Sequence, residues 1–198
     1  RDFDALDLIS DTAKRLSSGE MLQIERSFKK SMSEEIYFRM VKDKTASLIA
    51  TCCELGVITT SKDTYHKNAA RDYGEKLGMA FQIKDDLFDI LGATKDTGKD
   101  TNADVSKNMI TLPIIHTMSS SLSTAERRQL RKTLSNGAKR RDVKRLKEIV
   151  FEHGGFDYAK KKLQEFSDQA VSALSSFPDS TYKRSMIDLC LYNVQRTR

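Results

Sequence analysis

Three aspartates form the pattern in this chain that most clearly suggests chemistry. Asp85 and Asp86 are adjacent, and Asp89 follows one helical turn later, beside a run of apolar residues. Carboxylates at this spacing repel one another and destabilise a helix, so the pattern makes sense where a hard cation neutralises it. Magnesium keeps much of its water and binds through one or two carboxylates together with substrate phosphates. The aspartates therefore predict a magnesium–diphosphate site.

The motif alone is weak evidence. Asp occupies 18 of the 198 positions, and in a chain this rich in aspartate three of them can fall at this spacing by chance. Its neighbours strengthen it. The nineteen residues from 92 to 110 are rich in Gly, Asp, Thr and Lys, and they include Lys95, Lys99 and Lys107. Loops of that length are usually functional, and lysines beside carboxylates can close over a diphosphate that a metal bridges. The alternative is an ordinary solvated loop.

Lys44 is a second unusual residue. It lies between Met40 and Leu48, on or next to the apolar stripe of a predicted helix, and Thr45 follows it. A lysine in such a place needs an anionic partner, or it must extend its ammonium group to solvent. Extension to solvent is the common explanation, and a bound diphosphate would satisfy the charge equally well.

Histidines and cysteines indicate neither a metal site nor a nucleophile. The histidines are far apart and lack partners at ligand or triad spacing, so we predict that His66, His116 and His153 are surface or structural residues. Two of the three cysteines are adjacent, which is not the spacing of a disulfide framework. This cysteine usage favours a reducing, cytoplasmic compartment.

Composition limits the class of protein. A chain of 198 residues that is 38% hydrophobic and 31% charged suits one compact domain with a real core, and it excludes disordered and collagen-like proteins. No apolar run approaches the roughly 18 residues of a membrane-spanning helix. The net charge of +6 is modest, and the basic residues between 126 and 162 alternate with acids and lack aromatic stacking partners. We therefore expect no nucleic-acid binding.

The elements that position these residues are predicted to be helices throughout. Apolar residues recur at three-to-four spacing and strict alternation is missing, which predicts an all-α fold. Ser31 with Glu34, and Ser123 with Glu126, have the spacing of capping boxes at helix starts. The predicted helices cover residues 3–29, 34–57, 63–91, 113–118, about 124–135, 140–153, 156–176 and 180 to the end.

Apolar stripes run along the first three predicted helices. They consist of Leu6, Ile9, Ala13, Leu16, Glu20 and Ile24 in the first, of Ile36, Met40, Leu48, Cys52 and Leu55 in the second, and of Met79, Ile83, Leu87, Ile90 and Leu91 in the third. The aspartate motif lies on the third helix, next to its stripe. We therefore expect the carboxylates to project beside a buried face.

Taken in order, these motifs resemble the trans-isoprenyl (polyprenyl) diphosphate synthase family. The matching segments are Gly19-Glu20-x-x-Gln23, Lys44-Thr45, the run from Gly78 to Asp89 that reads as the family's second aspartate-rich motif, Gly98-Lys99, Asp104, and Thr111-Leu112-Pro113. The ordered set spans most of the chain and is far more specific than any one motif. The resemblance implies a helical bundle around a central cavity.

The resemblance also implies a reaction and its participants. Such enzymes ionise an allylic diphosphate, add isopentenyl diphosphate to the cation and eliminate a proton, with Mg²⁺ as cofactor and a homodimer as the assembly. By resemblance, Asp85, Asp86 and Asp89 hold magnesium on the allylic diphosphate. Lys44 and Lys99 bind that diphosphate as it leaves, and Thr45 and Gln82 line the reaction centre.

The sequence also departs from the family pattern. The first aspartate-rich motif and the upstream basic residues that bind isopentenyl diphosphate are absent. We therefore expect residues 1–198 to be the C-terminal portion of a single helical domain, unable to catalyse chain elongation alone. Met109 stands where many members have a lysine, for which Lys107 is a candidate substitute, and Leu48 replaces a polar or aromatic residue of some relatives.

Three alternatives remain at the level of the sequence. One is a non-catalytic regulatory subunit of a heteromeric synthase, against which the intact aspartate motif argues. Another is a terpene cyclase of similar helical fold, but its typical second metal motif of Asn, Ser or Thr, and Glu is missing at the matching place. The last is a generic helical interaction protein, which magnesium-dependent diphosphate binding would exclude.

Overall fold

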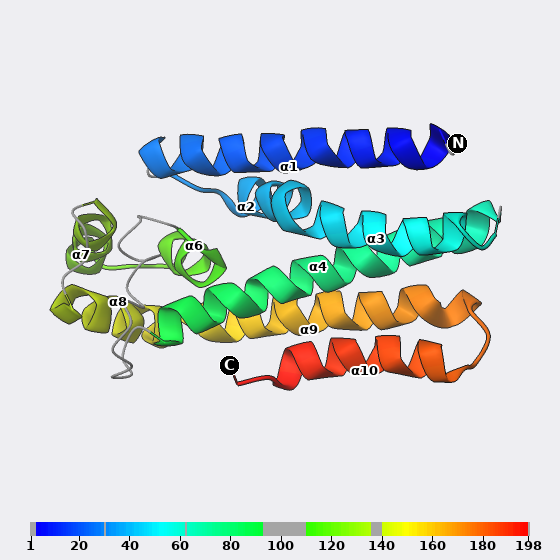
Figure 1. Cartoon of the computed structure of the whole chain (residues 1–198). Coiled ribbons are helices and arrows are strands. Elements are labelled where there is room, and N and C mark those ends of the chain that lie inside the picture. Colours follow the sequence, from blue (N-terminus) through cyan, green and yellow to red (C-terminus); the bar gives the residue numbers. More distant parts are fainter. Residues whose placement is uncertain (1–2, 30, 62, 93–109, 136–139, 198) are drawn as a thin grey trace. The chain divides into compact units, whose positions relative to one another are not determined.

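The computed structural model describes residues 3–29, 31–61, 63–92, 110–135 and 140–197. Every element in those ranges is a helix (Figure 1), as the apolar periodicity predicts. The elements are α1 (Phe3–Lys29), α2 (Glu34–Val41), the π-helical turn η1 (Lys42–Ala46), α3 (Ser47–Ile58), α4 (Thr64–Gly92), α6 (Leu112–Ser119), α7 (Thr124–Ser135), α8 (Arg140–Glu152), α9 (Gly155–Ala173), the 3₁₀ turn η2 (Leu174–Ser176) and α10 (Thr181–Gln195). Apart from the second predicted helix, each is close to its predicted bounds.

The chain packs as two compact units, and each is described by itself. The first unit consists of Arg1–Leu22, Phe38–Gln82 and Lys162–Arg198. The second consists of Gln23–Tyr37 and Ile83–Lys161. Several helices, α4 among them, contribute residues to both units. None of the described helices is both long enough and apolar enough to span a membrane.

The core of the first unit lies where α3, α4, α9 and α10 meet. Its buried members are Tyr73, Leu77, Ala170, Leu174 and Cys190. Ile49, Cys53, Phe177 and Met186 are among the partly buried residues packed against them. The chain turns between α9 and α10, so that these two helices run side by side in opposite directions (Figure 1). This packing supports the first part of α4, which ends with Gln82 in this unit.

A π-helical turn interrupts the second predicted helix. The prediction of one regular helix over 34–57 is therefore wrong in its middle, where η1 separates α2 from α3. A π turn adds one residue to the helical repeat, so the residues after it are rotated relative to those before it. Leu48 is consequently 49% exposed, although it was predicted to follow Met40 on the apolar stripe, and Cys52 is exposed as well. Ala50 and Glu54 take the buried positions.

The second unit is built on α6, α7 and α8, with the end of α4 and the start of α9. Both α6 and α7 pack against α8. The buried residues include Ile83, Leu87, Ile90, Leu112, Ile114, Leu130, Leu146 and Ile149. Pro113 occupies the first turn of α6, where its missing N–H is not needed. These contacts fix the last two turns of α4, which carry the aspartate motif.

Two predictions about helix starts have different outcomes. The capping box before α7 is confirmed, because the Ser123 backbone N–H donates to the Glu126 carboxylate over 2.9 Å and the Glu126 N–H donates back to the Ser123 hydroxyl over 3.3 Å. The box predicted at Ser31 is wrong. Ser33 begins α2 instead, since its hydroxyl accepts from the Ile36 N–H over 3.3 Å.

The predicted stripe of α1 is not a buried face among the described residues. Leu6, Ile9 and Ile24 are each at least half exposed. The buried positions are Thr12 and Gly19, because Thr12 hydrogen-bonds Thr51 over 2.6 Å where α1 contacts α3. On α4, by contrast, the predicted stripe is buried except for Leu91, which lies in the last turn and is 48% exposed.

Candidate active site

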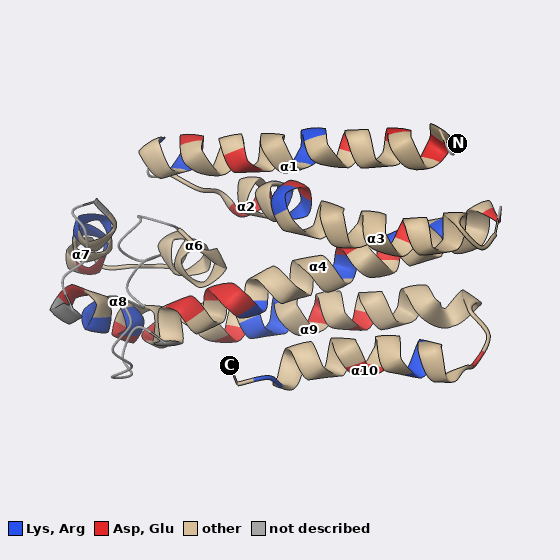
Figure 2. Ribbon diagram, viewed as in Figure 1, with Lys and Arg blue, Asp and Glu red and all other residues tan. Residues whose placement is uncertain are grey.

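The three aspartates lie near the C-terminal end of α4, in the acidic stretch coloured red in Figure 2. Asp86 is 4% exposed, and its Oδ2 accepts a hydrogen bond of 2.7 Å from the Tyr37 hydroxyl. Asp85 and Asp89 are partly exposed. The motif thus combines one buried, hydrogen-bonded carboxylate with two that solvent reaches, all within the second unit.

Tyr37 was missed by the sequence analysis, because a tyrosine near an apolar stripe reads as an ordinary core residue. Its ring is 1% exposed. Burial, and next the neighbouring Asp86 carboxylate, raise the pKa of Tyr37 well above its ordinary value. The phenol therefore stays protonated and donates to the carboxylate at every ordinary pH.

The described residues contain no ready-made metal cage. No group of three or more His, Cys, Asp or Glu side chains gathers in a metal-binding arrangement within the ranges that the structure describes. Magnesium does not require one, since it is usually held by one or two carboxylates plus substrate phosphates. The oxygen donors of Asp85, Asp86 and Asp89 fit a hard cation of this kind, and their assignment to the metal stays a prediction.

Lys44 lies in η1 and has an anionic partner within the protein. Its ammonium Nζ is 2.7 Å from Oε2 of Glu20 on α1, and both side chains are partly exposed. Lys44 is therefore neither a buried unpaired cation nor one that simply extends into solvent. Single π-helical turns occur frequently at functional sites, and the assignment of Lys44 and Thr45 to such a site stays a prediction.

Two glycines of the family motifs pack directly against this π turn. A Cβ on Gly19 would lie 2.5 Å from the Lys44 backbone nitrogen, and a Cβ on Gly78 would lie 2.6 Å from the Ala46 Cα. Real Cβ atoms do not approach backbone so closely, so α1 and α4 reach η1 only because these positions lack side chains. The glycines explain why η1 is held in place from two sides within the first unit.

Thr45 and Gln82 are brought together by the same packing. The Thr45 hydroxyl donates a hydrogen bond of 2.8 Å to Oε1 of Gln82, which joins η1 to α4. Both residues were predicted to line one reaction centre. Their contact is consistent with that prediction, although it does not by itself assign a chemical role.

Other predicted residues fall outside the described part of the chain. Lys99, assigned to the diphosphate, lies there, as do Lys95, Lys107 and Met109. Lys44, Thr45 and Gln82 belong to the first unit, and the three aspartates belong to the second. Within the first unit Lys44 pairs with Glu20 and Thr45 with Gln82, and within the second unit Tyr37 donates to Asp86.

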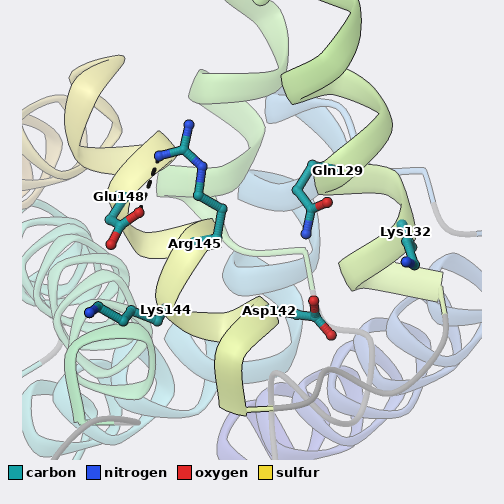
Figure 3. Close-up of a pocket in the computed structure, with 6 residues that line it drawn as sticks. All are labelled: Gln129, Lys132, Asp142, Lys144, Arg145 and Glu148. Carbon is teal, nitrogen blue, oxygen red and sulfur yellow. Dashed lines mark hydrogen bonds and ion pairs between the residues drawn. The ribbon is translucent and has the colours of Figure 1, made fainter.

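A cavity of about 400 Å³ lies elsewhere, in the second unit (Figure 3). Gln129 and Lys132 of α7 line one side, and the remaining lining residues, Asp142, Lys144, Arg145 and Glu148, come from α8. Arg145 is paired with Glu148 over 3.1 Å inside this set. The lining residues carry both positive and negative charges, and none of them is a predicted site residue. The cavity therefore does not change which residues we assign to the candidate active site.

Two of the histidines contact neighbouring side chains within the second unit. His116 stacks on Tyr158 with ring centroids 4.0 Å apart. His153 lies 3.3 Å from the Ser120 hydroxyl and 3.2 Å from the Glu126 carboxylate. Hydrogen bonds from Ser123 and then His153 lower the pKa of Glu126 to about 2. The capping carboxylate of α7 is thus strongly stabilised in its charged form.

Comparison with known proteins shows the family of the chain. The family model of polyprenyl synthetase matches residues 1–151. The chain belongs to the polyprenyl synthetase family. It is 30% identical over 191 residues to octaprenyl diphosphate synthase of Haemophilus influenzae, and the match covers 96% of this chain and 58% of that protein. Geranylgeranyl diphosphate synthase of Saccharolobus solfataricus is also 30% identical, with 99% of this chain and 59% of that protein covered.

Solved structures of family members share the fold. A decaprenyl diphosphate synthase from Rhodobacter capsulatus superimposes with a TM-score of 0.91 at 28% identity, over 100% of this chain and 61% of that one. A polyprenyl synthase from Caulobacter crescentus, complexed with calcium and isoprenyl diphosphate, gives 0.87 at 28% identity, over 100% and 60%. The all-α fold is therefore that of the isoprenoid synthases. The chain spans about three fifths of the length of these relatives.

Proposed function

We propose that the full-length protein is a prenyltransferase that condenses an allylic diphosphate with isopentenyl diphosphate. In this reaction the C–O bond of the allylic diphosphate breaks, the allylic carbon bonds to isopentenyl diphosphate, and a proton and pyrophosphate are released. One observation carries the proposal: Asp85, Asp86 and Asp89 stand intact on one helix of a chain whose residues 1–151 match the polyprenyl synthetase family.

Asp85, Asp86 and Asp89 are proposed to hold Mg²⁺ against the allylic diphosphate, because carboxylate oxygens are the ligands that this cation prefers. Bound there, the cation would neutralise charge that develops on the departing diphosphate. Asp86 is already fixed by the Tyr37 hydroxyl. Asp85 and Asp89 are partly exposed, so solvent reaches both side chains.

The remaining roles belong to Lys44, Lys99, Thr45 and Gln82. Lys44 and Lys99 are proposed to bind the diphosphate, since cations aimed at developing negative charge stabilise a transition state strongly in a dry site. Lys44 must then exchange the Glu20 carboxylate for a diphosphate oxygen. The Thr45 hydroxyl orients the Gln82 amide over 2.8 Å, and oriented oxygen dipoles can stabilise a neighbouring carbocation.

The test measures isopentenyl transfer by the full-length protein with Asp85→Ala, Asp86→Ala and, as a control, Asp72→Ala. Asp72 is an exposed aspartate on the same helix. The first two changes should lower kcat/KM by at least about 100-fold, as does the loss of a transition-state charge partner, and the control should not. Near-normal transfer by either variant would remove the mechanism. A wild-type protein that binds diphosphate but transfers nothing alone would favour the regulatory subunit.

We also propose that the protein is a homodimer, as the family resemblance implies. The supporting observation is a line of exposed apolar side chains along α1, which includes Leu6, Ile9, Met21, Ile24 and Phe28. Exposed apolar surface of this kind commonly marks an interface. Light scattering of the full-length protein should give twice the mass of one chain, and a single-chain mass would contradict the proposal.

A further inference from the structure

The hydrogen bond between Tyr37 and Asp86 joins two residues that are 49 positions apart. The two side chains are 1% and 4% exposed. A buried carboxylate and a buried phenol are each costly without a hydrogen-bond partner. At 2.7 Å, each supplies the partner that the other needs. The bond therefore links the first turn of α2 to the aspartate motif of α4 inside the second unit.

This bond restricts the orientation of the Asp86 carboxylate. The terminal torsion of an aspartate is broad and has only weak intrinsic preferences. A donor fixed on Oδ2 selects one orientation of the carboxylate plane, and the donor is itself fixed because the Tyr37 ring is packed in the core. A carboxylate offers about four lone-pair positions, and the phenol occupies one of them.

We propose that Tyr37 is a positioning residue, which holds the Asp86 carboxylate in the orientation that binds the divalent cation bridging to diphosphate. The inference rests on the proposed function, because it assumes that Asp86 is a metal ligand. Hydrogen-bond partners of this kind orient ligating carboxylates, and their loss typically weakens metal binding by about 10- to 100-fold. This effect on metal binding is separate from the contribution that Tyr37 makes to the stability of the fold.

Tyr73 provides a matched control for the folding contribution. Its side chain is 2% exposed, and its hydroxyl donates over 2.9 Å to the Met186 backbone carbonyl. Tyr37→Phe and Tyr73→Phe thus each remove a buried hydroxyl that donates a hydrogen bond. They differ in the acceptor, which is a motif carboxylate in one case and a main-chain carbonyl of α10 in the other.

The experiment is calorimetric binding of inorganic pyrophosphate to the full-length protein across a series of Mg²⁺ concentrations, with thermal unfolding of each variant alongside. Tyr37→Phe should raise the Mg²⁺ concentration needed for half-maximal binding by about 10-fold or more. Tyr73→Phe should leave it unchanged while lowering the melting temperature to a similar extent. In an Asp86→Asn background, Tyr37→Phe should add nothing, because both changes act through the same carboxylate.

The outcomes separate this inference from the proposed function. A wild-type protein that shows no magnesium-dependent pyrophosphate binding would overturn the proposed function and the inference with it. Normal binding by both wild type and Tyr37→Phe would overturn the inference alone, as would a full additional effect in the Asp86→Asn background. If Tyr37→Phe does not fold, Asp86→Glu keeps the charge but displaces the carboxylate from the phenol. An unchanged Mg²⁺ requirement in that variant would equally exclude positioning.

Discussion

The Lys44 ammonium lies 2.7 Å from the Glu20 carboxylate. This ion pair joins the Lys-Thr motif of η1 to the Gly-Glu-x-x-Gln motif of α1 within the first unit. Because Lys44 is proposed to bind diphosphate, Glu20 competes with the substrate for the same cation. The two motifs are therefore connected by charge as well as by the close packing of Gly19.

Glu20→Gln should strengthen pyrophosphate binding without a large effect on folding. The paired side chains are 35% and 52% exposed, and exposed ion pairs contribute at most about 1 kcal/mol. Affinity for pyrophosphate in the presence of Mg²⁺ should rise by up to about fivefold, which is the same free energy expressed as binding. Calorimetry would measure this affinity.

Glu25→Gln serves as the control, because it breaks a separate ion pair with Lys29 on the same helix. Weaker pyrophosphate binding by Glu20→Gln would show that Glu20 positions Lys44 instead of competing for it.

Gly19→Ala should destabilise the protein, because the added Cβ meets the Lys44 backbone at 2.5 Å. Forcing extra atoms into a well-packed contact costs about 1–3 kcal/mol. Gly56→Ala is the matched control, since a Cβ there has nothing within 4 Å and should stabilise α3 by up to about 1 kcal/mol through helix propensity. Urea unfolding of both variants compares the two free energies. If the two variants changed the free energy of unfolding equally, the close contact between α1 and η1 at Gly19 would not be needed for stability.

Thr45→Val should slow the transfer reaction, because it keeps the shape of the side chain but removes the donor to Gln82. Small misplacements in a reaction centre have large kinetic effects, so we expect kcat to fall by about tenfold or more. Thr45→Ser retains the hydroxyl and should stay close to wild type. Steady-state kinetics on the full-length protein would measure kcat for both variants. A Thr45→Val variant with the kcat of the wild type would show that the hydrogen bond to Gln82 does not contribute to catalysis.

Acid stability should depend on Glu126. Its pKa is lowered from 4.5 to about 2 in the folded protein, so folding favours the charged form. The stabilisation is complete above about pH 4.5 and is lost as the pH falls towards 2. Glu126→Gln should therefore flatten the fall of the melting temperature over this window while keeping part of the capping box. Circular dichroism melts between pH 2 and 7 measure the effect, and parallel curves for the two proteins would contradict it.

The sequence predicts the helical content and most helix bounds because Gly, Pro and capping residues mark the ends of helices. Pro113 begins α6, and Ser123 with Glu126 caps α7. The stripe on α4 is also predicted correctly, because a regular helix keeps one period over its length. The π turn is not predicted, since nothing in Lys42–Ala46 distinguishes it from an α-helical turn. The prediction that Leu48 and Cys52 lie on the apolar stripe is consequently wrong.

Only the site residues that stand out from their neighbours in the sequence can be predicted. The aspartates are recognisable by their spacing and Lys44 by its place next to an apolar stripe, whereas the roles of Thr45 and Gln82 are implied only by the family resemblance. Tyr37 is not recognisable, since its partner is 49 residues away and only the tertiary fold brings the two together. Periodicity likewise identifies the apolar side of α1 but does not indicate what that side contacts.

The π turn makes the number of residues between α2 and α3 critical for the packing of α3. Deleting one codon within Lys42–Ala46 would let the three segments merge into a continuous α-helix. Everything downstream would then rotate by about 100°, which would expel Ala50 and Glu54 from the interior and draw other side chains inward. Outside Lys44 and Thr45, a substitution in this stretch should therefore disturb the fold less than an insertion or deletion, which exchanges a whole helix face at once.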